Sequence, residues 1–169
     1  ESPKSARSKR NTAAKTARNP VDREQVFSLL DGAGISCRTV FHPPVYSMAD
    51  LDALPELAAE KSRIAKNLFL KGREKYLYVA RAEGGADLRA LGEKLSSPGL
   101  HFASERELSE TFGVGRGELT PFCALCPEAR EAVVLVDGFF AGGEIGVHPC
   151  DNAATVFLSA GALFGLLAV

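Results

Sequence analysis

Two apolar segments that flank a short loop constrain the fold of this chain more than any other feature. Residues 65–71 and 75–80 are rich in Leu, Phe, Tyr and Val, and Gly72-Arg73-Glu74 lies between them. This pattern predicts an antiparallel β-hairpin. A continuous apolar run at 132–137 predicts a further strand that is buried on both faces. The centre of the fold should therefore be a β-sheet.

Further strands and helices are expected at irregular intervals along the chain. Pro20 suits the first turn of a helix, and Ser104 with Glu107 forms the pattern of a capping box. About seven strands without strict strand–helix alternation favour an α/β or α+β domain with a mixed sheet. The additional strands are predicted at 36–42, 101–103, 119–125, 145–148 and 153–158, and the helices at 20–32, 47–54, 86–95, 104–112 and from 159 onward.

The length and composition favour one globular domain. The chain has 169 residues, of which 46% are hydrophobic and 24% are charged, and this composition excludes disorder of the whole chain. A chain of this length suits one domain, which we assign to residues 21–169. No apolar run reaches the roughly 18 residues that a membrane-spanning helix requires, so no membrane partner is expected.

Basic residues are concentrated at the start of the sequence. Residues 1–20 hold six Lys or Arg against one acid, Glu1, while the remainder holds 14 basic and 20 acidic residues. We expect a flexible basic leader at 1–20, which is either simply solvated or binds a polyanion. The leader contains no apolar residue larger than alanine, so we expect a cytoplasmic protein with reduced thiols. Because the sequence begins with Glu1 and not Met, we also expect a processed protein or a fragment.

The cysteines allow one metal hypothesis, which the pattern does not favour. Cys123 and Cys126 have the spacing of a zinc knuckle, and His148 and Cys150 could add ligands. The segment 119–125 is predicted to be a strand, however, and positions three apart in a strand face opposite sides. No second pair of cysteines has a suitable spacing. We therefore expect neither a metal nor another cofactor.

Three motifs allow both a functional and a structural interpretation. The glycines at 113, 115 and 117 follow a predicted helix, so they do not fit a dinucleotide-binding fingerprint. Such a loop is either a turn or a source of N–H groups for a developing oxyanion. Lys66 either snorkels from an apolar strand or binds an anion, and His148 is either structural or part of an active site. No motif supports a protein nucleophile.

Five segments together resemble the YbaK-like aminoacyl-tRNA editing family. The similarity runs from about Val21 to the C-terminus and is greatest to the prolyl-tRNA editing proteins, which remove alanine from tRNA-Pro. These are relatives of the editing domain inserted in prolyl-tRNA synthetase. The five segments are His42-Pro-Pro-Val-Tyr46, Lys66-Asn-Leu-Phe-Leu-Lys71, Leu100-His-Phe-Ala-Ser104, Gly117-Glu-Leu-Thr-Pro121-Phe122 and His148-Pro-Cys-Asp-Asn152-Ala-Ala-Thr155.

The resemblance implies a fold and a reaction. The family fold is a mixed, partly curled sheet with surrounding helices. Its members hydrolyse the ester between a wrong amino acid and the terminal ribose of tRNA. An aminoacyl ester is already activated, so a positioned water can attack it without a covalent protein nucleophile. The resemblance therefore implies a deacylase, most similar to those that act on Ala-tRNA-Pro.

The resemblance also implies roles for individual residues. Lys66 matches a lysine that contacts the 3′-terminal nucleotide or its phosphate, and Asn67 follows it as in the family. Gly117 and Pro121 match the Gly-x-x-x-Pro loop that shapes the pocket and holds the aminoacyl group. His148 matches a histidine of the site. Two further positions are Asn152, which matches an asparagine expected to bind substrate, and Cys150, which stands where the family often has an apolar residue.

The sequence leaves two other functions open. The first is deacylation of another mischarged tRNA, such as Ser-tRNA or Cys-tRNA. The second is a non-catalytic tRNA-binding or scaffolding module. The expected partners are mischarged tRNA and, beyond it, prolyl-tRNA synthetase or a complex of several synthetases.

Overall fold

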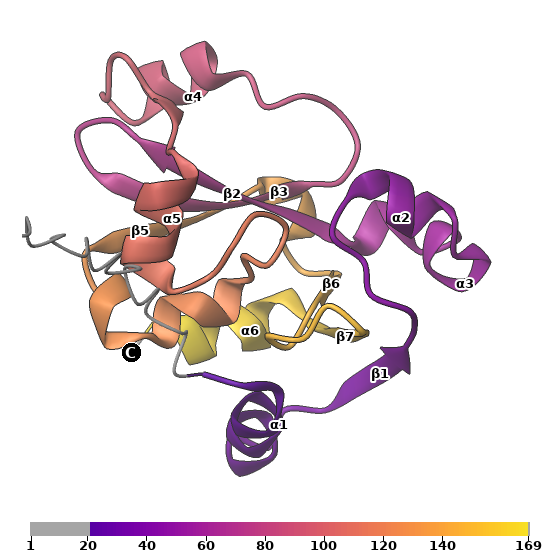
Figure 1. The fold of residues 1–169 in the computed structure, drawn as a ribbon. Coiled ribbons are helices and arrows are strands. Elements are labelled where there is room, and N and C mark those ends of the chain that lie inside the picture. Colours follow the sequence, from indigo (N-terminus) through magenta and orange to yellow (C-terminus); the bar gives the residue numbers. More distant parts are fainter. Residues whose placement is uncertain (1–20, 169) are drawn as a thin grey trace, which may run out of the picture.

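The computed structural model describes residues 21–168 and contains two β-sheets flanked by helices (Figure 1). The first sheet has the order β4-β2-β3-β5, in which β2 and β3 form the predicted antiparallel hairpin and β5 runs parallel to β3. The second sheet is antiparallel and has the order β1-β7-β6. The strands are β1 (Cys37–Phe41), β2 (Ala65–Lys71), β3 (Lys75–Arg81), β4 (His101–Phe102), β5 (Ala132–Val136), β6 (Glu144–Val147) and β7 (Ala154–Ser159).

The helices begin where the sequence supplies capping residues. Asp22, Ser47 and Ser104 each accept a hydrogen bond from the backbone N–H three residues on, and each forms a complete capping box. Gly113, at φ 68°, ends the helix that follows Ser104. The α-helices are α1 (Arg23–Gly32), α2 (Met48–Asp52), α3 (Pro55–Ala58), α4 (Leu88–Lys94), α5 (Glu105–Phe112) and α6 (Ala160–Leu167), and the 3-10 helices are η1 (Lys61–Arg63), η2 (Pro121–Leu125), η3 (Pro127–Ala129) and η4 (Gly138–Phe140).

The predicted fold class is confirmed, with one refinement and two corrections to the strands. The seven strands lie in two sheets, which an isolated parallel bridge between Ile64 and Gly146 connects. The predicted burial of the run at 132–137 on both faces is wrong. Strand β5 lies at an edge of its sheet, where Val133 is 42% exposed. The strand buried on both faces is β7, in which Ala154–Leu158 are all buried.

The predicted strand at 119–125 is also wrong, because this segment contains the 3-10 helix η2. Pro121 occupies its first turn, where a missing N–H costs nothing, and the Cys123 N–H donates to the Thr120 carbonyl. The strand argument against a zinc site at Cys123 and Cys126 therefore fails. Both cysteines are buried, and residues 21–168 contain no group of three or more His, Cys, Asp or Glu arranged to hold a metal ion.

The main core lies between the two sheets. Phe69, Leu77 and Val79 contribute to it from the first sheet, and Ile145 and Val156 from the second. None of the helices within the described range is long and apolar enough to cross a membrane. The predicted basic leader at 1–20 lies outside the described residues.

The junction between the sheets requires a residue without a side chain at position 146. A Cβ on Gly146 would lie 2.7 Å from the Phe157 ring and 3.1 Å from Cγ1 of Ile64. Both neighbours are buried, so neither can move away without disturbing the packing. Gly146 therefore permits the close contact through which the two sheets form one curled structure.

Replacing Gly146 with alanine should lower the free energy of unfolding by about 1–3 kcal/mol, because the added methyl overpacks the junction. Gly32→Ala is the matched control, since a Cβ there meets nothing within 4 Å. The control should leave the free energy of unfolding unchanged or raise it slightly. Urea unfolding followed by far-UV circular dichroism measures both values. Equal effects of the two substitutions would contradict the packing argument.

Candidate functional site

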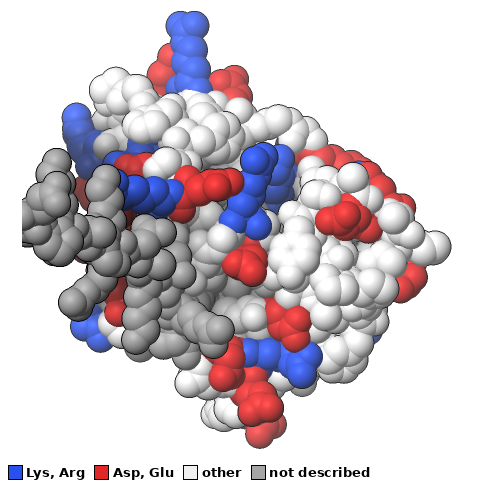
Figure 2. Space-filling model, viewed as in Figure 1, with Lys and Arg blue, Asp and Glu red and all other residues white. Residues whose placement is uncertain are grey.

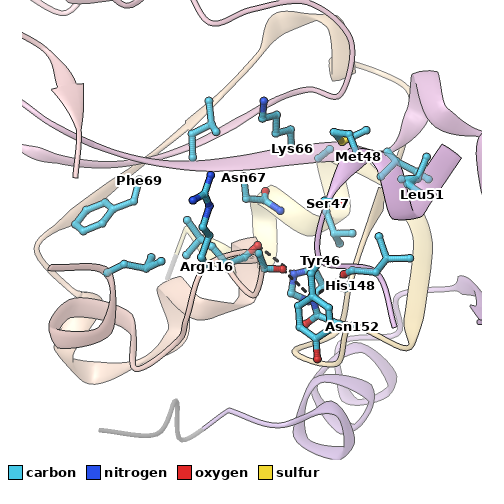
Figure 3. Close-up of a pocket in the computed structure, with 18 of the residues that line it drawn as sticks. Tyr46, Ser47, Met48, Leu51, Lys66, Asn67, Phe69, Arg116, His148 and Asn152 are labelled. Atoms are coloured by element: carbon cyan, nitrogen blue, oxygen red, sulfur yellow. Dashed lines mark hydrogen bonds between the residues drawn. The ribbon is translucent and has the colours of Figure 1, made fainter. Parts of the chain in front are cut away.

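A cavity of about 810 Å³ opens beside β2 and is the candidate functional site. Its walls come from β2, the loop before α2, the loop around Gly117 and the turn that joins β6 to β7 (Figure 3). Five of the six predicted site residues line it, although they are far apart in the sequence. These five are Lys66, Asn67, Gly117, His148 and Asn152.

The sixth predicted residue, Pro121, does not line the cavity. It is buried at the start of η2, and the residue before it, Thr120, donates a 2.6 Å hydrogen bond to the His148 carbonyl. Pro121 therefore supports the site from behind, by setting the helix start that holds His148. Cys150 also lies outside the cavity lining and packs against the main core.

Strand β2 presents two neighbouring side chains on opposite faces. Lys66 is exposed, while Asn67 projects to the side of the strand on which His148 lies (Figure 3). This is the alternation expected for successive residues of a strand. Lys66 therefore lies at the rim of the cavity, and Asn67 lies inside it.

One edge of β2 is open at Asn67. On that side β4 pairs only with Leu70 and Lys71, and the Phe69 carbonyl accepts from the Ala103 N–H. Backbone groups two residues apart in a strand face the same edge, so the N–H and C=O of Asn67 also face it. Asn67 therefore offers the cavity a side-chain amide together with a backbone donor and acceptor.

Gly117 fixes the opposite wall by a close backbone contact. Its φ is 80°, a region that favours glycine, and a Cβ there would lie 2.4 Å from the Tyr46 carbonyl oxygen. A glycine is thus required for both conformation and space. The loop around it is held directly against the segment before α2.

Asn152 connects three segments of the cavity wall. Its side-chain Nδ2 donates to the backbone carbonyls of Val45 and Gly117, each at 2.7 Å. The backbone carbonyl of Asn152 accepts from the Val45 N–H at 2.9 Å. Both amide hydrogens are therefore used within the protein. Asn152 lines the cavity, and its hydrogen bonds make it a brace of the wall; its predicted role in substrate binding stays a prediction.

His148 is a neutral hydrogen-bond acceptor. Its Nε2 lies 3.1 Å from the Leu119 carbonyl, which can only accept, so Nε2 carries the hydrogen. Nδ1 is then unprotonated, and it is buried with no hydrogen-bond partner among residues 21–168. Burial lowers the pKa of His148 to about 4, against the favourable effects of the Leu119 carbonyl and of the Glu118 and Asp151 carboxylates. The imidazole is therefore uncharged at neutral pH.

Several lining residues received no role from the sequence. His42 donates through Nδ1 to the Pro43 carbonyl at 2.8 Å and accepts through Nε2 from the Thr155 hydroxyl at 2.9 Å, which fastens this loop to β7. Tyr46 and Phe102 are 53% and 57% exposed at the rim. The segments that carried the family resemblance contain all four residues. A large exposed aromatic ring, however, cannot be distinguished from a buried one by sequence.

Arg116 is a further residue that the sequence did not single out, and it shares an unusual property with Lys66. Nine of the 14 Lys and Arg in residues 21–168 form ion pairs with described acids. Figure 2 shows several basic side chains lying beside acidic ones on the visible face. The five cations without a described acidic partner include Lys66 and Arg116, and both line the cavity. The acid Glu105 also lines the cavity, so these two cations exceed the acidic charge of the lining and favour anions.

Comparisons with a family model and with known proteins agree with one another. The family model of the aminoacyl-tRNA editing domain matches residues 42–166. The prolyl-tRNA editing protein ProX of Acetoanaerobium sticklandii is 36% identical over 141 residues, which are 81% of this chain and 85% of that protein. The prolyl-tRNA synthetase associated domain-containing protein 1 of Danio rerio is 29% identical over 143 residues, 81% of this chain and 77% of that protein.

Solved structures show the same fold. The crystal structure of the hypothetical protein APE2540 superposes with a TM-score of 0.71 at 18% identity, covering 88% of this chain and 95% of that one. A candidate trans-editing enzyme for prolyl tRNA synthetase superposes with a TM-score of 0.67 at 20% identity, covering 87% and 92%. With the family model matching most of the chain and ProX 36% identical over most of its length, this chain belongs to the aminoacyl-tRNA editing domain family.

Proposed function

We propose that this chain is an aminoacyl-tRNA deacylase that hydrolyses Ala-tRNA-Pro. Membership of the editing family and the similarity to ProX support this class of reaction. The observation that carries the proposal is one cavity with two cations lacking an acidic partner at its rim and two buried acceptors inside, among the residues described. Such a site suits a ligand that is anionic at one end and polar at the other.

Lys66 and Arg116 bind the phosphate groups at the 3′ end of the tRNA in this proposal. Lys66 contributes a compact point charge, and Arg116 can contact a phosphate through two N–H groups. Both side chains are exposed, which suits contact with a large nucleic acid. The aminoacyl group then enters the cavity beside Asn67.

The proposed nucleophile is water. The hydroxyls of Ser47 and Ser104 cap helices, and the Thr155 hydroxyl donates to His42, so each is held in a structural hydrogen bond. A backbone N–H, such as that of Asn67 at the open edge of β2, can stabilise the oxyanion that develops on the ester carbonyl. Pocket size then selects alanine against proline.

We also propose partners and a cellular location for this protein. Mischarged tRNA is the substrate, and prolyl-tRNA synthetase or a complex of synthetases is proposed as a partner in the cytoplasm. Deacylation of a panel of purified aminoacyl-tRNAs tests the substrate directly. Faster hydrolysis of Ser-tRNA or Cys-tRNA than of Ala-tRNA-Pro would favour the first alternative. Binding of tRNA without hydrolysis would favour a non-catalytic module.

Lys66→Ala should lower kcat/KM for Ala-tRNA-Pro by about 100-fold or more, because a charge-assisted contact with phosphate is lost. Lys94→Ala is the matched control, since Lys94 is also exposed and without a described acidic partner but does not line the cavity. It should leave kcat/KM unchanged. Single-turnover deacylation of radiolabelled Ala-tRNA-Pro measures both. Near-normal activity of Lys66→Ala would contradict the assigned role.

Gly117→Ala should reduce deacylation by at least about tenfold, because the added Cβ pushes the Tyr46 backbone out of the cavity wall. Gly84→Ala separates this clash from backbone strain, since Gly84 has a similar φ of 88° but nothing within 4 Å of its Cβ position. The control should lose about 1 kcal/mol of stability and no activity. Equal loss of activity in both variants would show that the clash with Tyr46 is not the cause of the loss.

The stability of the protein should fall on acidification because His148 is buried in its neutral form. The unfolded chain takes up a proton near pH 6.5 and the folded chain only near pH 4, so the contribution is intact above pH 6.5 and is lost as the pH falls toward 4. Between pH 7 and pH 5 the loss should be about 2 kcal/mol. Urea unfolding should show it in the wild type and in His101→Gln, but not in His148→Gln. Parallel pH dependences in all three proteins would exclude His148 as its source.

A further inference from the structure

Two buried polar atoms, both on residues that line the cavity, have no hydrogen-bond partner in the described part of the chain. They are Oδ1 of Asn67 and Nδ1 of His148, and both residues line the cavity. Figure 3 shows Asn67 leaving β2 on the side where His148 lies. A buried acceptor without a donor is destabilising, so two such acceptors on residues that line one cavity indicate a ligand that supplies donors.

The chemistry of these two atoms restricts the ligand. Nδ1 of His148 can only accept, because Nε2 donates to the Leu119 carbonyl and the imidazole is neutral. The backbone C=O of Asn67 adds a third acceptor at the open edge of β2. An ester carbonyl has no hydrogen to donate, a ribose hydroxyl has one and water has two. A primary ammonium has three, which equals the number of acceptors.

We propose that Asn67 and His148 bind the α-ammonium group of the aminoacyl ester, so that the enzyme requires a substrate with a free amino group. The inference rests on the proposed function and specifies how its site selects the class of substrate. It makes Asn67 and His148 binding residues of the ammonium. Lys66 and Arg116 remain the binding residues of the phosphates.

The charged residues around the cavity agree with separate binding sites for the ammonium and the phosphates. The Glu118 and Asp151 carboxylates favour positive charge at His148, although Asp151 also pairs with Arg23 at 2.6 Å. Lys66 leaves β2 on the face opposite to Asn67, and Arg116 is exposed. The strand therefore separates the Lys66 cation from the acceptors. A positive group can enter beside Asn67 while the negative backbone of the nucleic acid stays at the rim.

Three substrates on the same tRNA-Pro test the proposal: the alanyl ester, its N-acetyl derivative and the lactyl ester. The lactyl ester has a hydroxyl in place of the amine and adds no bulk. Each enzymatic rate is divided by the spontaneous rate of the same ester, which removes differences in intrinsic reactivity. We expect this enhancement to fall at least about 100-fold for both amine-free esters, because contacts to a charged group are lost. Equal enhancements for all three esters would overturn the proposal.

Substitutions at Asn67 identify the chemistry of the contact. Asn67→Asp keeps only acceptors, so deacylation of the alanyl ester should stay within about tenfold of the wild type. Asn67→Leu keeps the approximate size of the side chain and should lose about 100-fold. Thermal melting establishes that both variants are folded. Loss of activity in both variants would show that the side chain at position 67 donates to the substrate, and retention in the Leu variant would show that it makes no required polar contact; either result would overturn the proposal.

A binding experiment distinguishes failure of this inference from failure of the proposed function. The probes are the stable amide analogue of 3′-alanyl-adenosine and its N-acetyl derivative. The ¹⁵N signal of His148 Nδ1 should shift on addition of the free amine and not of the acetylated analogue. Absence of deacylation with this shift present would overturn the proposed hydrolysis alone. An unchanged signal with the free amine would overturn the ammonium site, whether or not the protein hydrolyses Ala-tRNA-Pro.

Discussion

The open edge of β2 at Asn67 is the structural condition on which the site depends. Strand β2 is paired with β3 along its whole length, whereas β4 covers the other edge only at its far end. The uncovered part leaves backbone donors and acceptors facing a cavity, and the alternation of the strand places Lys66 and Asn67 on opposite faces. One short segment thus supplies a cation at the rim of the cavity and neutral polar groups on its inner side.

The rest of the site holds other segments against that edge. Gly117 lies directly against the Tyr46 backbone. The Asn152 side chain donates to the carbonyls of Gly117 and Val45, and the Thr120 hydroxyl donates to the His148 carbonyl. Few of these groups are free to react. Their hydrogen bonds position a cavity in which an activated ester can meet water, which agrees with a reaction that needs orientation more than a protein nucleophile.

Local signals in the sequence predicted most of the fold. The hairpin, the capping boxes and the apolar strands each depend on residues close together in the chain, so their patterns are readable. The segment at 119–125 was misassigned because Pro121 and the following turns favour a 3-10 helix over the strand that its apolar residues suggest. The run at 132–137 was placed on the inside of the sheet, because sequence cannot show which strand becomes the edge.

The site was predictable only through its resemblance to a family. Lys66, Asn67, Gly117, His148 and Asn152 line one cavity, but nothing in their spacing indicates that they meet. The exposed rim residue Arg116 carried no signal, since most Lys and Arg within residues 21–168 have an acid nearby and only geometry identifies the exceptions. The protonation of His148 likewise depends on burial, which single-sequence patterns do not report.

The brace at Asn152 has a consequence for how the protein matures on the ribosome. A single amide just before β7 ties together segments that are made about 107 and 35 residues earlier. The early hairpin can form as soon as it emerges, but the walls around it cannot lock until Asn152 has been synthesised. Nascent chains should therefore pass through a stage with a folded hairpin and an unformed site.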